Sequence, residues 1–117
     1  MIMTMKQPSA DDQAAPAGPV PTMFEAIVRL VTVSATYNRG TVTLAPHAIY
    51  TRHDEMYVDA VCLLRDGKPP REEKIGTYKL AGLVDLKLAG ATFRPSKLFA
   101  PGDERYAGTL LMAVEGR

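Results

Sequence analysis

Basic side chains and tyrosines are the residues of this chain whose types and spacing suggest chemistry, and that chemistry is the binding of anions. The span from Arg65 to Lys97 holds eight lysines and arginines against four acids, whereas the rest of the chain is slightly acidic. Cations beside aromatic rings attract phosphates and stack nucleobases, so we predict a face that binds single-stranded nucleic acid or a small anionic ligand. A solvated surface is the competing interpretation, because charge runs commonly serve only solvation. The residues of the predicted face are Lys79, Lys74, Arg94, Tyr57 and Tyr78.

The candidate nucleophiles do not form a catalytic pattern. Ser34 and Ser96 lack the strand-turn-helix context of a nucleophile elbow. Cys62, the only cysteine, falls on the apolar side of an expected strand without a predicted basic neighbour, which favours an inert core thiol. We therefore predict no catalytic residues and no enzymatic activity.

Metal and cofactor sites are not predicted either. The spacing of His47 and His53 matches no metal-binding pattern, and no glycine-rich loop has the spacing that cradles phosphates. Asp59 falls in the middle of a strongly apolar strand, where an unpaired carboxylate would be costly. We expect Asp59 to pair with Lys79 or Arg52 across the sheet, with a ligand-orienting role as the alternative.

Length and composition favour one small domain. The 117 residues suit a single modest core, which we expect over residues 22–117. The net charge of +1 argues against a protein that coats nucleic acid indiscriminately. A single cysteine and no secretory signal favour the cytoplasm, and no apolar run approaches the length of ~20 residues that a membrane-spanning helix needs.

The N-terminal third predicts a tail, a helix and a strand. Residues 1–21 are rich in proline and small polar residues without apolar periodicity, which is typical of a disordered tail. Thr22 followed by Glu25 is the pattern of a capping box, so we expect a short helix to begin there. Apolar and polar residues then alternate over 31–37, as in a half-buried strand.

The longest apolar run, Met56 to Leu64, predicts the central strand of the sheet. Alternate residues of this run are apolar while the others are mixed, which indicates burial on one side and partial cover on the other. Before it, the loop 38–40 places Gly40 where a positive φ is needed and leads into a returning strand over 41–44. Pro46 predicts a bend or a sheet edge near 45–46, because proline donates no ladder hydrogen bond, and residues 49–50 are candidates to continue the strand beyond it.

Two further strands are expected over 74–80 and 83–88, after an exposed loop over 65–73. Gly76 and Gly82 suggest bulges or bends that let the sheet curl. The pattern over 106–114 fits a strand or a short helix, and we favour the strand. The fold class predicted is therefore mainly β, a small five-stranded SH3-like or Sm-like barrel preceded by one short α-helix.

The order of these elements and two short motifs resemble the WYL domain family. That family is named for a Trp-Tyr-Leu strand, followed by a basic strand that typically reads Phe-Arg-Leu-Asp-Arg-Ile. In this chain 56–58 reads Met-Tyr-Val, so only Tyr57 matches the first motif. The second motif corresponds to 78–83, with Lys79 at its first arginine and with Ala81 and Gly82 at its Asp and second Arg. The resemblance covers residues 22–88.

The resemblance implies a function as well as a fold. WYL domains are SH3-like or Sm-like barrels found in bacterial transcription regulators, where they sense a ligand, often nucleic acid, through the basic strand. We therefore predict a stand-alone, non-enzymatic module for ligand sensing or nucleic-acid association. The alternative is a structural module that forms homo-oligomers through a sheet edge and the apolar residues 110–112.

Overall fold

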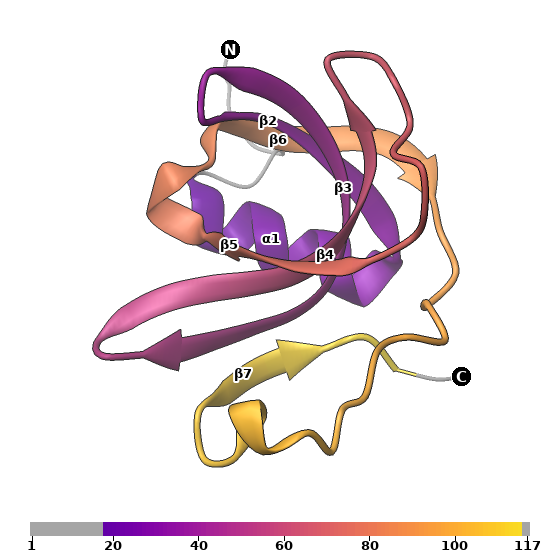
Figure 1. Cartoon of the computed structure of the whole chain (residues 1–117). Helices are drawn as coiled ribbons and strands as arrows, with labels where there is room; N and C mark the ends of the chain where they lie inside the picture. The colour runs from indigo at the N-terminus through magenta and orange to yellow at the C-terminus, as the bar shows by residue number, and fades with distance from the viewer. Residues whose placement is uncertain (1–17, 116–117) are drawn as a thin grey trace, which may run out of the picture.

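The computed structural model describes residues 18–115, which form one α-helix, six β-strands and two short 3₁₀ helices (Figure 1). This confirms a mainly β fold that opens with a short helix. The predicted disordered tail lies outside the described residues, apart from 18–21. In chain order the elements are α1 (Pro19–Arg29), β2 (Val31–Tyr37), β3 (Gly40–Arg52), β4 (Glu55–Arg65), β5 (Ile75–Lys79), η2 (Leu80–Gly82), β6 (Val84–Thr92), η3 (Glu104–Tyr106) and β7 (Leu110–Ala113).

The centre of the sheet is β3, and not the Met56 to Leu64 strand that the sequence suggested. The strands are ordered β5-β4-β3-β2-β6, all neighbours are antiparallel, and β7 joins β3 separately. The first half of β3 lies between β4 and β2, and its second half lies between β4 and β7. The apolar run 56–64 forms most of β4. The alternating apolar residues of this run reflect burial on one face and partial cover on the other, and not a position at the centre of the sheet.

The bend or sheet edge predicted near Pro46 falls inside β3, as a local irregularity of a strand that continues past it. The strand continues to Arg52, with a register shift against β4 between Pro46 and Ala48. On the other side, pairing with β2 reaches Leu44 and pairing with β7 begins at Ala48. Proline therefore lies where the strand exchanges one neighbour for another, a place where a missing amide donor is tolerated.

Tight two-residue turns join β2 to β3 and β3 to β4. In the first, Asn38 and Arg39 have φ of 51° and 69°, and in the second His53 and Asp54 have φ of 53° and 67°. Positive φ at both central residues is the hairpin geometry that matches the twist of the flanking strands. The positive φ expected at Gly40 thus falls on the two residues before it.

The inner face of the sheet packs against α1, which Figure 1 shows lying across the strands. The helix begins at Pro19, three residues before the predicted start, because proline is compatible with the first turn, where its missing amide is not needed. Thr22 is not the cap, since its hydroxyl donates to the Gly18 carbonyl over 2.7 Å. The fully buried aliphatic side chains of this layer include Met23, Ile27, Val33, Val42, Leu44, Ile49 and Val58.

The outer face of β3 and β4 is covered by the C-terminal segment, residues 93–115. Within this segment β7 pairs with the second half of β3, which confirms the predicted strand for part of 106–114. Phe99 and Tyr106 pack with Ala48, Tyr50 and Tyr57 of the sheet. The partial cover predicted for the second face of the 56–64 strand is therefore supplied by chain that follows it by about forty residues.

The outermost strands β5 and β6 are joined through η2, and no strand pairing links them within residues 18–115. Closure of the sheet into a barrel therefore stays a prediction. Gly82 ends η2, and a Cβ there would lie 3.1 Å from the Tyr37 ring, so a larger residue would require that ring to shift. The bulge suggested at Gly76 is wrong, because the β4–β5 register is regular through that residue.

Candidate functional site

Tyr57 and Lys79 are direct cross-strand partners on β4 and β5. Side chains of paired residues share one face of a sheet, so the Lys79 ammonium stem lies beside the Tyr57 ring. Arg52, near the end of β3, places its guanidinium carbon 5.9 Å from the centre of that ring and 5.7 Å from that of Tyr50. We call Arg52, Tyr57 and Lys79 the Tyr57 surface.

The two cations of the Tyr57 surface differ in how far they are neutralised. Lys79 forms an ion pair with Glu55 over 2.8 Å, and this hydrogen bond and charge raise the pKa of Lys79. Both side chains of that pair are about half exposed, at 47% each, so salt and competing anions reach it. Arg52 is exposed and has no acidic partner among residues 18–115. A ligand anion therefore meets a free guanidinium first.

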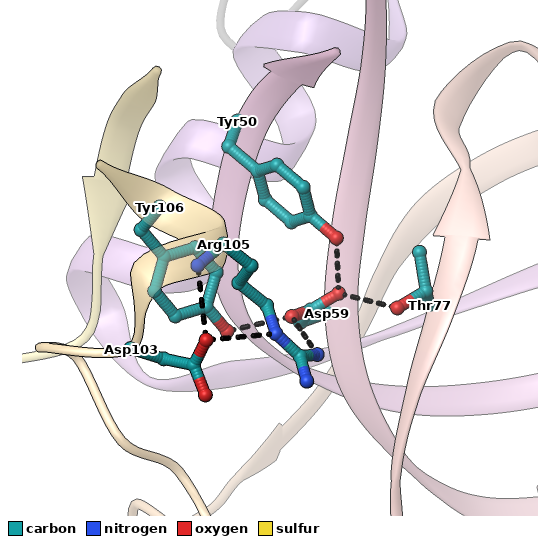
Figure 2. A network of polar contacts seen from close by, with 6 residues as sticks. All are labelled: Tyr50, Asp59, Thr77, Asp103, Arg105 and Tyr106. Atoms are coloured by element: carbon teal, nitrogen blue, oxygen red, sulfur yellow. Dashed lines mark hydrogen bonds and ion pairs between the residues drawn. The ribbon is translucent and has the colours of Figure 1, made fainter. Parts of the chain in front are cut away.

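Asp59 lies two residues along β4 from Tyr57, on the same face, and is fully buried. Figure 2 shows four side chains converging on its carboxylate. Tyr50 and Thr77 each donate a hydroxyl to Oδ1 over 2.8 Å. Tyr106 donates to Oδ2 over 2.6 Å, and Arg105 Nη1 lies 3.3 Å from the same oxygen.

This network explains how a carboxylate is tolerated in an apolar strand, and it corrects the predicted partners of Asp59. Lys79 bonds to Glu55 instead, and Arg52 lies on tyrosine rings. Arg105 is held in turn by Asp103, whose carboxylate also accepts the Arg105 backbone amide over 2.9 Å. Burial, followed by the bond to Asp59, raises the pKa of Tyr106, so its hydroxyl stays a donor at neutral pH. The carboxylate is thus saturated by donors and fixes the C-terminal segment to the sheet.

The five residues predicted to form one binding face do not lie together. Tyr57 and Lys79 are neighbours on the outer face, while Lys74 and Tyr78 line a separate small pocket. Tyr78 points to the opposite, inner face, where its ring meets Tyr37 edge-on at 5.1 Å and burial raises its pKa to about 12. Lys74 precedes β5, is 75% exposed and lies 3.9 Å from Glu72, and Arg94 follows β6 in the C-terminal segment.

Arg52, Arg105 and Tyr106 are the residues near this surface that sequence reasoning did not assign to a site. Arg52 is the last residue of β3, and the sequence suggests it only as a partner of Asp59. Tyr106 begins the stretch 106–114 that is predicted as a strand or a short helix, Arg105 directly precedes it, and the two lie 47 and 46 residues from Asp59. No local pattern links them to β4, so only the fold brings them there.

Three residue types of a hydrolase triad meet beneath the C-terminal segment, but their bonds are wrong for catalysis. The Ser96 backbone amide donates to His47 Nε2 over 2.8 Å, while the Ser96 hydroxyl donates to Glu73. Because Nε2 accepts, neutral His47 carries its proton on Nδ1 and donates it to the Ala45 carbonyl over 2.8 Å. The histidine thus contacts no hydroxyl that it could activate.

Burial of His47 between the rings of Phe93 and Phe99 lowers its pKa, against the opposing pull of the Ala45 carbonyl and the Glu73 charge. A neutral ring is the state that accepts from Ser96. His47 is therefore a second anchor of the C-terminal segment, beside Asp59.

No family model, curated protein or solved structure matches this chain. Within residues 18–115, no three histidine, cysteine or acidic side chains are grouped so that they could hold a metal ion. The one α-helix of that range is too short to cross a bilayer. The geometry of the Tyr57 surface is accordingly the basis on which a function is proposed.

Proposed function

We propose that this chain is a non-enzymatic, nucleic-acid-associated regulatory module of the WYL type, and that the Tyr57 surface binds single-stranded nucleic acid. The observation that carries the proposal is the pairing of Tyr57 with Lys79 across β4 and β5. Tyr57 is the residue retained from the first WYL motif and Lys79 stands at the first arginine of the second, and the two lie on one face of the sheet, where Tyr57 is partly buried and Lys79 is exposed.

The physical basis is an aromatic ring next to two cations. A base that stacks on Tyr57 gains on the order of 1–3 kcal/mol, and every base offers a π-face. Lys79 is the cross-strand partner of Tyr57, and the Arg52 guanidinium lies over the face of the ring, so a base that stacks there takes the place of Arg52 and leaves both cations close to its phosphates. A bound phosphate has to replace Glu55 as the ion-pair partner of Lys79, so we expect the affinity to be modest and to fall as salt is added.

The competing possibility of catalysis has little chemical support in the described residues. The Asp59 carboxylate is saturated by four donors, and the nitrogens of His47 are both engaged. Neither is free to act as a base. We place the module in the cytoplasm, where the single cysteine of the chain would stay reduced.

The test is fluorescence anisotropy of labelled single-stranded DNA and RNA of about 12 nucleotides, a length that covers one small β domain. We expect binding that weakens steeply between about 50 and about 300 mM salt. Tyr57→Leu and Arg52→Ala should each weaken it about tenfold. Lys87→Ala is the matched control, since it removes an exposed cation from β6, and it should leave affinity within about twofold.

Two results would overturn this function. One is the absence of binding at low salt. The other is an equal loss from Arg52→Ala and Lys87→Ala, because the interaction would then depend on net charge and not on the Tyr57 surface.

Self-association is the second candidate, and the observation that favours it is the exposed strand β6. This strand has nine residues and a neighbour on one side only, and Val84 is 54% exposed. Leu110 and Leu111 of β7 are 38% and 46% exposed. Light scattering across a hundredfold range of concentration tests it: a rising mass that Val84→Lys abolishes supports the assembly, and a constant monomer mass rejects it.

A further inference from the structure

A groove of about 440 Å³ lies between the loop after β4 and the start of the C-terminal segment. Its volume is in the range of small-molecule sites. Neither Tyr57 nor Lys79 lines it, so it is separate from the Tyr57 surface. The apolar part of its lining consists mainly of Val61, Leu63, Pro69, Pro70 and Phe93.

The apolar lining comes from three directions and suits a flat hydrophobic body. Val61 and Leu63 alternate on the outer face of β4, and Leu63 remains 37% exposed. Pro69 and Pro70 line the groove from the loop, and Phe93 does so from the C-terminal segment. Water on such a surface is displaced favourably by a ring or a short alkyl chain.

The polar part of the lining leaves two arginines available. Arg71 and Arg94 both line the groove, and neither has a hydrogen-bond or acidic partner among residues 18–115. Two acids also line the groove: Glu73 accepts the Ser96 hydroxyl and keeps its charge, and Glu72 lies 3.9 Å from Lys74. The groove therefore holds charges of both signs, and its two arginines are the cations without an ion-pair partner.

The inner end of the groove is built before any ligand arrives. His47 is 1% exposed and both of its ring nitrogens are hydrogen-bonded, one of them to Ser96. The bond to His47 ties Ser96 to β3, and the Ser96 hydroxyl bond to Glu73 ties the C-terminal segment to the loop. Polar recognition of a ligand falls to Arg71 and Arg94, whose planar guanidinium groups match a carboxylate in two-point contact.

We propose that this groove binds a small organic acid, with a carboxylate between Arg71 and Arg94 and an apolar body over Val61, Leu63 and Phe93. The site is distinct from the nucleic-acid surface, and it gives the module a small-molecule input beside its macromolecular one.

Phenylbutyrate is a suitable probe, because it combines a carboxylate with a ring on a short chain. We expect a dissociation constant on the order of 0.1–1 mM for a ligand of this size. In a titration followed by amide resonances, the shifts should map to residues 61–63, 70–73 and 93–96. Phenylbutanol lacks the charge and acetate lacks the ring, so each should bind at least about tenfold more weakly.

Variants of the two arginines test where the carboxylate of phenylbutyrate binds. Arg71→Gln and Arg94→Gln should each weaken phenylbutyrate binding about tenfold, as expected for loss of a charge-assisted hydrogen bond. Lys68→Gln is the matched control, since it removes a cation of the same loop that does not line the groove, and it should change binding less than twofold. Both arginines are exposed, so the variants should keep the fold.

The proposal is overturned if phenylbutyrate does not bind, if phenylbutanol binds equally well, or if Lys68→Gln has the effect of Arg94→Gln. Oligonucleotide binding by the same samples separates this site from the other. Tyr57→Leu should reduce oligonucleotide binding and leave phenylbutyrate binding intact, so either function can fail while the other survives.

Discussion

The two faces of the sheet are held by different forces. The inner face packs against α1 through aliphatic side chains such as Ile27, Val33 and Leu44, which are almost completely buried. The outer face is covered by the C-terminal segment, which depends on two buried polar anchors, Asp59 and His47. Apolar packing contains no group that gains or loses a proton, whereas a buried acid and a buried histidine depend on their partners and on their protonation. The outer layer is therefore the part of the molecule that conditions can change.

Removing the Asp59 carboxylate should have the largest effect on this comparison. Asp59→Ala leaves Tyr50, Thr77, Tyr106 and Arg105 without their acceptor, and loss of a buried charged partner costs about 3–5 kcal/mol. Urea unfolding measures the loss. Asp59→Asn keeps an acceptor oxygen and should cost less, and a loss below about 1 kcal/mol in Asp59→Ala would show that the network adds little.

Leu44→Ala is the corresponding change on the inner face. It empties a fully buried site beneath α1, for which a loss of about 2–5 kcal/mol is expected from transfer and cavity terms. Because this loss comes from apolar packing, the change in unfolding free energy should be the same at pH 5 and at pH 8. A strong pH dependence would mean that the two faces are not independent.

Acidification should loosen the outer face first. The pKa of His47 is lowered in the fold, so its stabilising contribution is complete above the unfolded value of 6.5 and is lost as pH falls below it toward the folded pKa. Protonated His47 no longer accepts the Ser96 amide. Hydrogen exchange at pH 7.5 and at pH 5 should show that the backbone amides of Ser96 and Leu98 lose protection at the lower pH, while the amide of Val33 stays protected. Uniform loss at all three sites would contradict a separate outer layer.

Arg105→Gln should have the smallest effect. Its side chain is 43% exposed, so solvent screens the pair with Asp59, and three hydroxyl donors remain on that carboxylate. We expect unfolding free energy to change by less than about 1 kcal/mol. Arg39→Gln in the β2–β3 turn is the matched control, and a loss comparable to that of Asp59→Ala would instead make the ion pair the main anchor.

The sequence was a better guide to the inner face than to the outer one. Alternation over 31–37 located β2 to the residue, and the apolar run 56–64 lies within β4. Both patterns record burial against neighbours that apolar side chains alone can specify. The bend or edge predicted near Pro46 is a gap in pairing, and the fold shows this gap to be a change of partner within one strand.

The candidate site was less predictable, because its residues meet through tertiary contacts. Tyr57 and Lys79 are part of the face predicted from the sequence. Arg52 joins them only when the β3–β4 hairpin forms, and Arg105 reaches Asp59 from a distant segment whose sequence shows no link to β4. Lys74 and Arg94 were grouped with Lys79 on charge alone. Charge along a chain carries no information on which face of a sheet a side chain occupies.

The pairing of β7 with β3 has a consequence for synthesis and for damage to the chain. Until β7 forms, the amide and carbonyl groups around Ile49 and Tyr50 have a partner on one side only. A nascent polypeptide still attached to the ribosome, or a product clipped ahead of Leu110, would present that row of groups to any extended peptide nearby. By pairing with β3, the four-residue strand β7 covers backbone groups that could otherwise pair with another chain and start a fibril.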